Sequence, residues 1–539
     1  MYKICLIILM TLFMPFMSEG VAAKRPQLPH NIEEAYSPKN VREVLDIEQK
    51  RAFMHSWKTA DANGMIHASS DIKNKKITLG GSGFCVMSIL AGADRGWITE
   101  EEALDRVLNV TSFLKRADRI HGAWSHWMNP DGTPARFGKQ IEAGDIVETS
   151  FMVMGLLCAS EYFDGKTAKE IRLRKDVQDL WEGIDWNFYT DGGNFLYWGL
   201  DRTTGNYFLP IKAYNEALVT YILALAAENG NGIDPQVYSE GWWNTKKGWN
   251  PGRTYYGYDF PLGGPYGGPM FLSHYSFLGM NPKDMQDSKV NYYTNGAKHA
   301  MIQRHYCMYE APKEYGYNEF NWGLSAGNGP KGKGYQARMP LRDDGVIAPT
   351  AALASMPYTP FYSIQVLMEL HYNHPELQTQ YGFGDGYSIV DNWVERGIIA
   401  IDNEPIVIMI ENYRSGLFWN LMKDNEIIRR GLEKTDIRKP SFKTGFPYAV
   451  RNTVTDTYDM IRHPDRGVYE LDFCLEEASE VEFTLRDKKG REIQFPRQDY
   501  AAGVNIFSFD DHRIVRGERY HLEMKDNDNI KATIDITLN

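Results

Sequence analysis

Two kinds of helical segment alternate between residues 40 and 435, and this alternation limits what the chain can fold into. Charged amphipathic segments, such as 101–115 and 169–185, can leave one face in water. Apolar segments rich in small residues, such as 150–160 and 217–227, must be covered on all sides. A ring of helical hairpins with the apolar helices inside meets both demands, and about six pairs close an (α/α)6 toroid. The alternative is an open α-solenoid, but the segments lack the fixed repeat period of such arrays.

Apolar residues recur at the helical period in about a dozen segments of this part of the chain. We expect helices over residues 41–59, 83–93, 99–117, 145–163, 168–186, 213–228, 235–249, 269–278, 292–311, 349–374, 388–393 and 406–432. Pro357 and Pro360 divide the 349–374 segment into two pieces. Thr99 followed by Glu102 predicts a capping box, so that helix should begin at residue 99 or 100.

The pattern changes after Lys434, where a linker gives way to short alternating runs typical of strands. These runs cover residues 469–475, 480–486, 505–509, 519–524 and 531–538. The segment 487–490, Asp-Lys-Lys-Gly, predicts a hairpin turn. We therefore expect a mainly α chain, with an (α/α)6 domain over residues 35–440 and a small β-sandwich of immunoglobulin-like type over residues 445–539.

The N-terminus has the pattern of a cleaved export signal. Lys3 precedes an apolar run from residue 4 to 17, and small residues lead to Ala23. This run is shorter than the roughly 20 residues that a membrane-spanning helix needs. Cys5 lies inside the run, too early to be a lipidated first residue of the mature chain. We expect a signal peptide over residues 1–23 and a soluble, periplasmic or secreted protein without membrane insertion.

Charge and cysteine content exclude several classes of partner. The net charge is −11, from 59 basic and 70 acidic residues, and no basic patch could neutralise a nucleic acid backbone. Four further cysteines lie in apolar stretches without the spacing of metal ligands; they are Cys85, Cys158, Cys307 and Cys474. We expect these to be buried free thiols, and we expect no zinc or other metal, no cofactor, no nucleic acid partner and a monomer.

Carboxylates at the start of the apolar helices are the first catalytic candidates, because helix ends line the central cleft of a toroid. Asp145 and Glu148 open one such helix on the same face, and Glu142 lies in the loop before it. Capping and complementation of the helix dipole are the alternative for each. Glu216 stands at the start of another apolar helix, where desolvation would raise its pKa as a general acid requires.

Two further acids have both a catalytic and a structural interpretation. Glu411 follows five apolar residues, so a buried acid there needs a partner or a function, and Arg414 could be that partner. Asp344 lies in a loop after Arg338, where it could be a catalytic base or a member of an ion-pair cluster.

Aromatic residues concentrate in the loops, where they could stack on the apolar faces of sugar rings while polar side chains bind the hydroxyl groups. Each could instead pack its own loop. His274 lacks a second histidine at metal-ligand spacing, so we expect it to bind substrate or to lie in the core. The candidate substrate-binding residues are Glu142, Trp124, Trp127, Trp198, Tyr214, Asn215, His274, Trp322 and Arg338.

Several segments taken in order resemble the glycoamylase-like domain, family 144 of the glycoside hydrolases, over most of residues 40–435. The matching segments are GSGF at 81–84, DIVETS at 145–150, WNFY at 186–189, YNEA at 214–217, HYSFLG at 274–279, WGLSA at 322–326 and DGVIAPTAA at 344–352. The C-terminal β module is not part of the resemblance.

The resemblance implies an (α/α)6 barrel and an endo-β-1,2-glucanase that inverts the anomeric centre and releases short oligosaccharides of the sophorose series. Glu216 is then the expected general acid, with a second carboxylate from Asp145, Glu148, Asp344 or Glu411. Three alternatives remain: an exo-acting β-glucan hydrolase, a lyase acting on acidic glycans, and a glycan-binding protein without catalysis. A lyase would need a basic cleft, which the negative charge balance disfavours.

Overall fold

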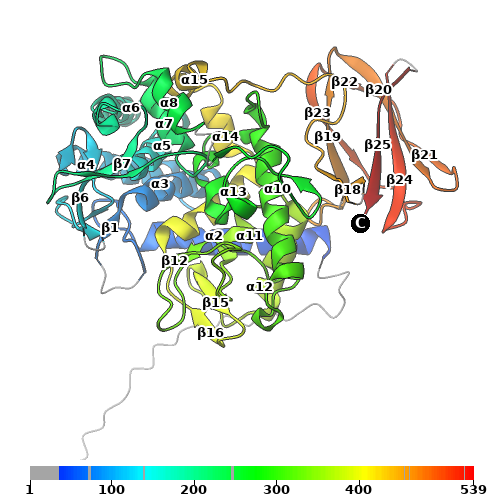
Figure 1. Cartoon of the computed structure of the whole chain (residues 1–539), viewed down its shortest axis with the longest axis horizontal. Helices are drawn as coiled ribbons and strands as arrows, with labels where there is room; N and C mark the ends of the chain where they lie inside the picture. Colours follow the sequence, from blue (N-terminus) through cyan, green and yellow to red (C-terminus); the bar gives the residue numbers. More distant parts are fainter. Residues whose placement is uncertain are drawn as a thin grey trace, which may run out of the picture.

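The computed structural model describes residues 36–70, 75–137, 140–243, 248–454, 456–460, 462–526 and 529–539. Helices dominate the described chain up to residue 433, and strands make up the C-terminal part from residue 451 (Figure 1). This confirms a largely helical N-terminal part followed by a β-sheet region. The predicted signal peptide, residues 1–23, lies outside the described residues.

Most of the predicted helical segments contain an α-helix. The helices are α2 (Pro38–Lys58), α3 (Leu79–Asp94), α4 (Glu100–Arg116), α5 (Ile146–Tyr162), α6 (Ala168–Glu182), α7 (Leu218–Ala226), α8 (Pro235–Gly241), α10 (Tyr292–His305), α11 (Pro349–Leu353), α12 (Pro360–Asn373), α13 (Ala400–Arg414), α14 (Leu417–Met422) and α15 (Glu426–Glu433). The predicted capping box is present, since Thr99 accepts from the amide of Glu102 and the Glu102 side chain accepts in return.

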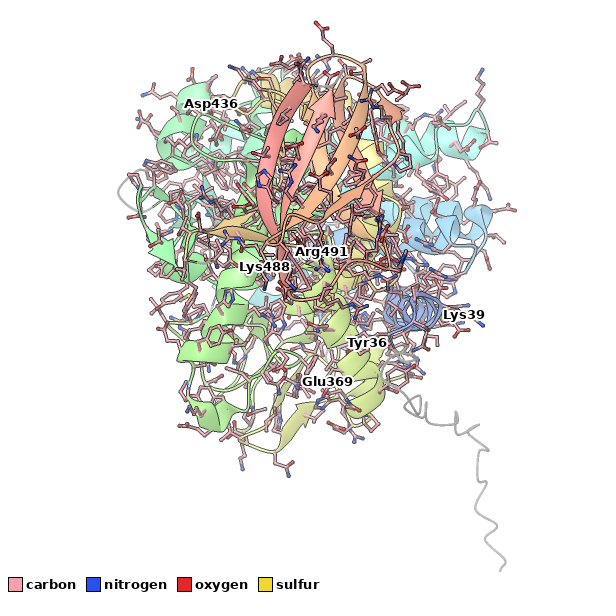
Figure 2. The ribbon with its side chains drawn as sticks, turned by 90° about the vertical axis from the view of Figure 1, so that its right-hand side faces the viewer. Tyr36, Lys39, Glu369, Asp436, Lys488 and Arg491 are labelled. Carbon is pink, nitrogen blue, oxygen red and sulfur yellow. The ribbon has the colours of Figure 1, made fainter. Side chains whose placement is uncertain are left out.

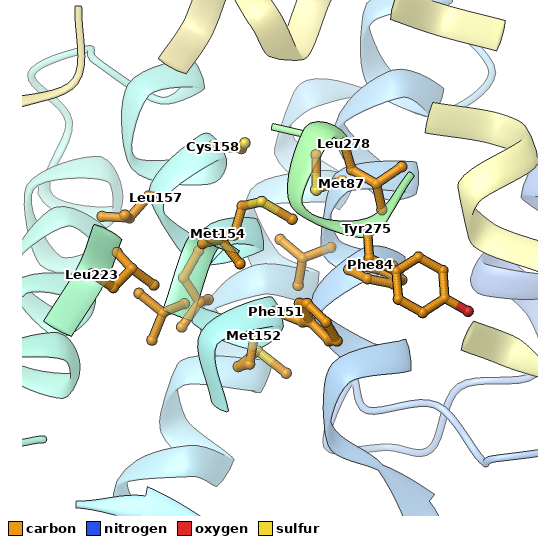
Figure 3. Packing of buried hydrophobic residues seen from close by; sticks show 14 of the residues in the cluster. Phe84, Met87, Phe151, Met152, Met154, Leu157, Cys158, Leu223, Tyr275 and Leu278 are labelled. Carbon is orange, nitrogen blue, oxygen red and sulfur yellow. The ribbon is translucent and has the colours of Figure 1, made fainter. Parts of the chain in front are cut away.

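The apolar helices form the inner layer of the helical part. Every residue of α3 from 79 to 93 is buried, as is every residue of α5 from 146 to 159. The two helices touch along their backbones, because a Cβ atom on Gly83 would stand 2.4 Å from the Phe151 carbonyl oxygen. Figure 3 shows side chains of α3, α5 and α7 packed together with Tyr275 at the edge of the cluster. Small residues thus permit the close approach that a covered helix needs.

Amphipathic helices cover this inner layer. Helices α4 and α6 pack against each other and leave their charged faces in solvent (Figure 1). Helix α15 packs on α7 through Gly431, where a Cβ atom would stand 2.1 Å from the Ile222 carbonyl oxygen. Helix α13 lies between α2 and α3. The alternation seen in the sequence therefore separates inner helices from outer ones.

Several predicted helices are wrong in type or extent. Helix α7 begins at Leu218 rather than at residue 213, and α8 ends at Gly241 rather than at residue 249. Residues 388–393 form a hairpin between β15 (Gly386–Ser388) and β16 (Trp393–Glu395), with Asn392 in the left-handed region at φ 46°. Residues 269–278 form two short 3-10 turns rather than an α-helix. Helix α13 begins at Ala400 rather than at residue 406 and continues through Pro405, and the predicted single helix over 406–432 is divided among α13, α14 and α15. Each error concerns a segment where tertiary contacts, rather than periodicity, decide the backbone conformation.

A four-stranded antiparallel sheet, in the order β5–β6–β7–β8, leads into α5. Its strands are β5 (Arg136–Phe137), β6 (Gln140–Asp145), β7 (Tyr197–Asp201) and β8 (Tyr207–Pro210). Asp145 pairs with Gly199 in this sheet, which brings the neighbouring Trp198 close to the start of α5. The remaining short strands of the helical part are β1 (Ile77–Thr78), β2 (Arg119–Ile120), β3 (Ala123–Trp124), β4 (Trp127–Met128), β9 (Thr254–Tyr255), β10 (Tyr258–Asp259), β11 (Ala326–Gly327), β12 (Gln336–Ala337), β13 (Gln378–Thr379) and β14 (Gly382–Phe383).

The C-terminal β module has two layers, and in Figure 2 its strands lie in front of the helices. One layer runs β17–β18–β25–β24–β20–β21, with β22 also paired to β20; the other is the pair β19–β23. Their bounds are β17 (Arg451–Asn452), β18 (Thr457–Met460), β19 (Tyr469–Leu475), β20 (Ser479–Asp487), β21 (Glu492–Gln494), β22 (Gln498–Tyr500), β23 (Gly503–Phe509), β24 (Glu518–Asp526) and β25 (Asn529–Leu538). Phe483 stacks on Phe507 across the layers, with ring centroids 3.8 Å apart. The predicted turn at 487–490 is present, with Gly490 at φ 78°.

The predicted thiol state is confirmed, since Cys85, Cys158, Cys307 and Cys474 are all free and buried. None of the described helices is long and apolar enough to span a bilayer.

Candidate active site

The N-terminal ends of four inner helices meet at one place. Gly80, in the first turn of α3, donates its amide to Glu148 of α5 at 2.7 Å. The charge of Glu148 raises the pKa of Glu216, which stands just before α7. The charges of Asp402 in α13, Glu216 and Glu148 all raise the pKa of the Tyr275 hydroxyl. Partial positive charge at helix N-termini favours carboxylates there. We call Asp145, Glu148, Glu216, Asp385 and Asp402 the carboxylate cluster.

Asp145 caps α5 and is fully buried. Its Oδ1 accepts from the amides of Val147 and Glu148, both at 2.9 Å. Its Oδ2 lies 3.0 Å from Nδ1 of His126 and accepts from Nε1 of Trp198 at 3.1 Å. Both oxygens are therefore committed to protein groups, which favours the capping interpretation of this residue.

Glu148 is nearly as buried as Asp145, but fewer of the described protein groups bind its carboxylate. Besides the Gly80 amide, its carboxylate has the His126 ring 3.9 Å away. The pKa of Glu148 is raised to about 7. Burial is the main cause, His126 opposes it, and the charge of Asp145 supports it. Glu148 is thus poised to exchange a proton near neutral pH.

Glu216 has the properties of a general acid. Its side chain is partly accessible to solvent and forms no hydrogen bond with another side chain in the described part of the protein. Desolvation raises its pKa to about 7, and the charges of Glu148 and Asp145 add to this effect. The backbone on either side is held firmly: the Glu216 carbonyl accepts from Ser276 Oγ, and Asn215 Oδ1 accepts from the Ala217 amide at 2.8 Å. A fixed backbone thus presents a carboxyl group that its own backbone amide contacts but that no other side chain binds in the described chain.

Asp385 and Asp402 join the cluster and were absent from the candidates based on sequence. Asp402 Oδ1 accepts from the Tyr275 hydroxyl at 3.3 Å, and its Oδ2 accepts from the Tyr335 hydroxyl at 3.4 Å. The side chain of Asp385 contacts Asp402 and accepts from the Asn328 amide at 3.0 Å. Asp402 lies in the first turn of an apolar helix, as Glu148 does. The same pattern could have revealed it had α13 been predicted to begin at residue 400.

Tyr275 and Tyr335 approach Asp402 differently. Tyr275 is buried beside Phe84 and Phe151, and Figure 3 shows its hydroxyl pointing away from that core. Tyr335 comes from the loop between β11 and β12 and remains 52% exposed, although its hydroxyl reaches the buried Asp402. An aromatic face in solvent beside a carboxylate is a suitable surface for a sugar ring.

Asp344 is an ion-pair partner in this structure. Arg338 donates from Nε to its Oδ1 at 2.6 Å and from Nη2 to its Oδ2 at 3.3 Å. Arg338 Nη1 donates to the carbonyl oxygens of Gly327 and Asn328 at 2.7 and 3.2 Å. Arg338 is 1% exposed, so its guanidinium is occupied in holding the loop that carries Tyr335. This geometry favours the ion-pair cluster over the catalytic and substrate-binding alternatives.

Glu411 also has a charged partner, but a different one from that expected. Arg95 donates to it through Nε at 2.7 Å and Nη2 at 2.8 Å. Arg414, the partner considered from the sequence, pairs with Asp46 and Gln49 instead. Glu411 is fully buried, and it lies about 13 Å along α13 from Asp402 at 1.5 Å per residue. It is therefore remote from the carboxylate cluster.

The aromatic candidates divide by burial. Trp124 and Trp322 are fully buried, and Trp124 donates to the Leu114 carbonyl at 3.0 Å. Trp127 and Trp198 are partly exposed, and Trp198 contacts Asp145 directly. Tyr214 is buried against Trp242, with ring centroids 5.6 Å apart. Of the four tryptophans, Trp127 and Trp198 thus retain surface for a ligand.

Of the polar candidates, His274 lies in the core, where its Nε2 is 3.0 Å from Ser355 Oγ. Burial lowers the pKa of His274 to about 3, so the ring is neutral. Asn215 caps the turn before α7. The side chain of Glu142 lies outside the described residues. Within the described part of the chain, no group of three or more His, Cys, Asp or Glu side chains is arranged to hold a metal ion.

Comparison with known proteins identifies the family. The family model Glycoamylase matches residues 208–426. The solved structure of the endo-β-1,2-glucanase from Chitinophaga pinensis, in complex with sophorotriose and glucose, is 38% identical, with a TM-score of 0.70. The match covers 74% of this chain and 99% of that one. The chain belongs to the glycoamylase family.

A curated protein and a solved structure from Parabacteroides distasonis are also similar to this chain. The curated exo β-1,2-glucooligosaccharide sophorohydrolase is 37% identical over 424 residues, which is 74% of this chain and 58% of that protein. This chain therefore spans less than two thirds of that relative's length. The solved β-1,2-glucanase structure is 36% identical, with a TM-score of 0.70, and the match covers 74% of this chain and 60% of that one.

Proposed function

We propose that this protein is a glycoside hydrolase that cleaves β-1,2-glucan with inversion. The observation that carries the proposal is the Glu216 carboxyl group, which is partly accessible, has no side-chain hydrogen-bond partner in the described chain and has a pKa raised to about 7. A general acid must be protonated at the working pH and free to reach the leaving oxygen. The relatives at 36–38% identity that are named for β-1,2-glucan support the choice of substrate.

Asp402 is our proposed general base. Inversion needs a second carboxylate roughly 6.5–9.5 Å from the acid, so that a water molecule fits between them. Asp344 and Glu411 are paired with arginines, and the oxygens of Asp145 are occupied by four protein groups. In the described part of the chain, Asp402 accepts from two hydroxyl groups and is hydrogen-bonded to Asp385. Glu148 is the remaining alternative among the candidates from sequence.

A cleavage cycle follows from these roles. Protonated Glu216 donates to the glycosidic oxygen as the bond to the anomeric carbon breaks. An ionised Asp402 takes a proton from water, whose oxygen attacks that carbon from the opposite side. Partly exposed Trp127, Trp198 and Tyr335 provide faces for the sugar rings. After product release, Glu216 recovers its proton from solvent and Asp402 loses one.

Endo-cleavage is the mode that we propose, as named for the Chitinophaga relative, while the curated Parabacteroides relative is named for exo-release of sophorose. The deciding test is incubation of the purified protein with linear β-1,2-glucan, other β-glucans, starch and uronic acid polymers. We expect a mixture of short oligosaccharides from β-1,2-glucan alone. Release of disaccharide only would indicate exo-action, unsaturated products would indicate a lyase, and no cleavage of any polymer would contradict catalysis.

A matched pair of variants tests the acid. We expect Glu216→Gln to lower turnover by about 10²–10⁴-fold while binding is retained, because the shape remains and the proton is lost. Glu228→Gln, an exposed glutamate two residues after α7, is the control and should leave turnover unchanged. Near-normal turnover in Glu216→Gln would remove Glu216 from the mechanism.

We further propose that the inner helices α3, α5, α7 and α13 belong to an (α/α)6 toroid over residues 35–440, and that residues 445–539 form an immunoglobulin-like sandwich. The alternation of helix types and the two layers of the module support these assignments. The predicted signal peptide supports a periplasmic or secreted location, which cell fractionation would test.

A further inference from the structure

A cavity of about 370 Å³ lies between the helical part and the β module, and its lining residues do not include the carboxylate cluster. In Figure 1, β18, β19 and β23 lie on the side of the module that faces the helices. The helical part contributes Tyr293, Tyr362 and Tyr413 to the cavity, and the module contributes Tyr458, Arg466 and Asp472. Pockets for small ligands have volumes of roughly 300–1,000 Å³, so a short saccharide fits this range.

Aromatic rings from both parts line this interdomain cavity. The Tyr413 ring from α13 lies parallel to that of His463 in the module, at 6.2 Å. Tyr293 of α10 meets Tyr448 at 5.3 Å, and the Lys283 ammonium lies 4.9 Å from the Tyr293 ring centre. Tyrosines combine a flat apolar face with a polar hydroxyl, which matches the two surfaces of a sugar ring.

The charges in the cavity are balanced. Lys283 pairs with Asp472 at 2.9 Å across the boundary between the two parts, and Arg466 pairs with Glu470 within the module. Burial lowers the pKa of His463, so its ring is neutral at pH 7. Two cations and two anions leave no net charge to attract an ionic ligand. They do provide both donors and acceptors, which the hydroxyl groups of a neutral sugar require.

The cavity is close to the catalytic machinery without being part of it. Tyr358 lines the cavity, and its hydroxyl donates to the Ser273 carbonyl at 2.9 Å, two residues before Tyr275. One layer of side chains therefore separates the cavity from the segment that carries Tyr275. A glycan segment bound there would stay beside the active site while the carboxylate cluster acts on another part of the same glycan.

We propose that the interdomain cavity is a second saccharide-binding site, which takes a short neutral stretch of glycan from the polymer that the carboxylate cluster cleaves. The identity of that glycan rests on the proposed function. The β module then has a role in the enzyme, because it supplies half of this site through Tyr458, Arg466 and Asp472.

Calorimetric titration of the full-length Glu216→Gln protein with β-1,2-linked glucotriose, up to millimolar concentration, tests this site. We expect two binding sites per chain. Ala449→Trp, which places a large ring into the cavity, should remove one site and leave the other. The double variant Tyr458→Ala with Asp472→Asn should do the same by removing a ring and a charge. Ile530→Ala, on the exposed face of β25, is the control and should retain both sites.

A single site in the Glu216→Gln background, or two sites that survive Ala449→Trp in a protein with an unchanged melting temperature, would overturn the proposal. Cleavage of β-1,2-glucan by the wild-type protein is measured separately and decides the proposed function. If that cleavage is absent, the titration is repeated with neutral gluco-oligosaccharides of other linkages. The cavity proposal then fails if no tested oligosaccharide loses its binding in the Ala449→Trp variant.

Discussion

The carboxyl groups of Asp385 and Asp402 are in hydrogen-bonding contact, although both are acids and both are buried. Two ionised carboxylates can only accept hydrogen bonds, so this contact requires that one of them carries a proton. Burial raises the pKa of Asp385 to about 7 and that of Asp402 well above its usual value. The charge of Asp385 raises the pKa of Asp402 further, whereas the hydrogen bond between them lowers the pKa of Asp385. A pair that shares one proton near neutral pH still contains one ionised carboxylate, and the proposed cycle requires that the charge lies on Asp402 when water is activated.

Asp385→Asn should move the acidic limb of the pH profile. The amide keeps a hydrogen bond to Asp402 but removes a neighbouring negative charge, so the pKa of Asp402 falls. Because the base must be ionised, kcat/KM should then remain high at lower pH than in the wild-type protein. Asp499→Asn, on the exposed strand β22, is the control. An acidic limb that stays in place would show that Asp402 is not the base.

Glu216 should determine the basic limb of the pH profile and should lower the stability of the folded protein at high pH. Its acid form is needed, so kcat/KM should fall as pH rises through about 7. Between about pH 4.5 and 7, Glu216 is protonated in the folded protein and ionised in the unfolded chain. The free energy of unfolding therefore falls as pH rises across that window. Glu216→Gln should therefore raise the free energy of unfolding at pH 8, by at most about 3 kcal/mol. Urea unfolding at pH 5 and pH 8 measures this, and an equal effect at both values would contradict it.

Gly80→Ala should disturb Glu148 directly. A Cβ atom on Gly80 would stand 2.5 Å from Glu148 Oε2, in a part of α3 that is fully buried. We expect a loss of about 1–3 kcal/mol in the free energy of unfolding, as for other overpacked cores, together with lower turnover. Gly264→Ala is the matched control, because its Cβ would meet nothing within 4 Å and its φ is −69°. Full activity in Gly80→Ala would show that the position of Glu148 does not matter.

Glu411→Gln separates a structural role from a catalytic one. The substitution leaves Arg95 without its buried carboxylate, and breaking a buried ion pair costs about 3–5 kcal/mol. Because Arg95 is itself 23% exposed, we expect the lower end of that range. Turnover per folded molecule of Glu411→Gln should be unchanged. The control is Glu433→Gln, whose ion pair with Arg429 is exposed, and its stability should be unchanged. A stable but inactive Glu411→Gln protein would return Glu411 to the catalytic candidates.

Local signals in the sequence determined the order and type of most elements. The capping box at Thr99 and Glu102 marks the start of α4, and the alternating run 469–475 coincides with β19. The apolar, small-residue-rich composition of segments 150–160 and 217–227 predicted that these helices are covered, and α5 and α7 are. Such signals act within a few residues, through hydrogen bonds and side-chain spacing along one element.

Tertiary contacts decided which carboxylates share a site. Glu411 meets an arginine 316 positions away, and no spacing within α13 indicates that partner. Trp322 and Trp198 both lie near turns in the sequence, yet the first is buried and the second is partly exposed. Asp385 and Asp402 become a pair only when the bend between β14 and β15 and the start of α13 come together. Burial, pairing and pKa depend on contacts between distant segments, so the sequence alone determined the elements while the tertiary structure decided which acids can act.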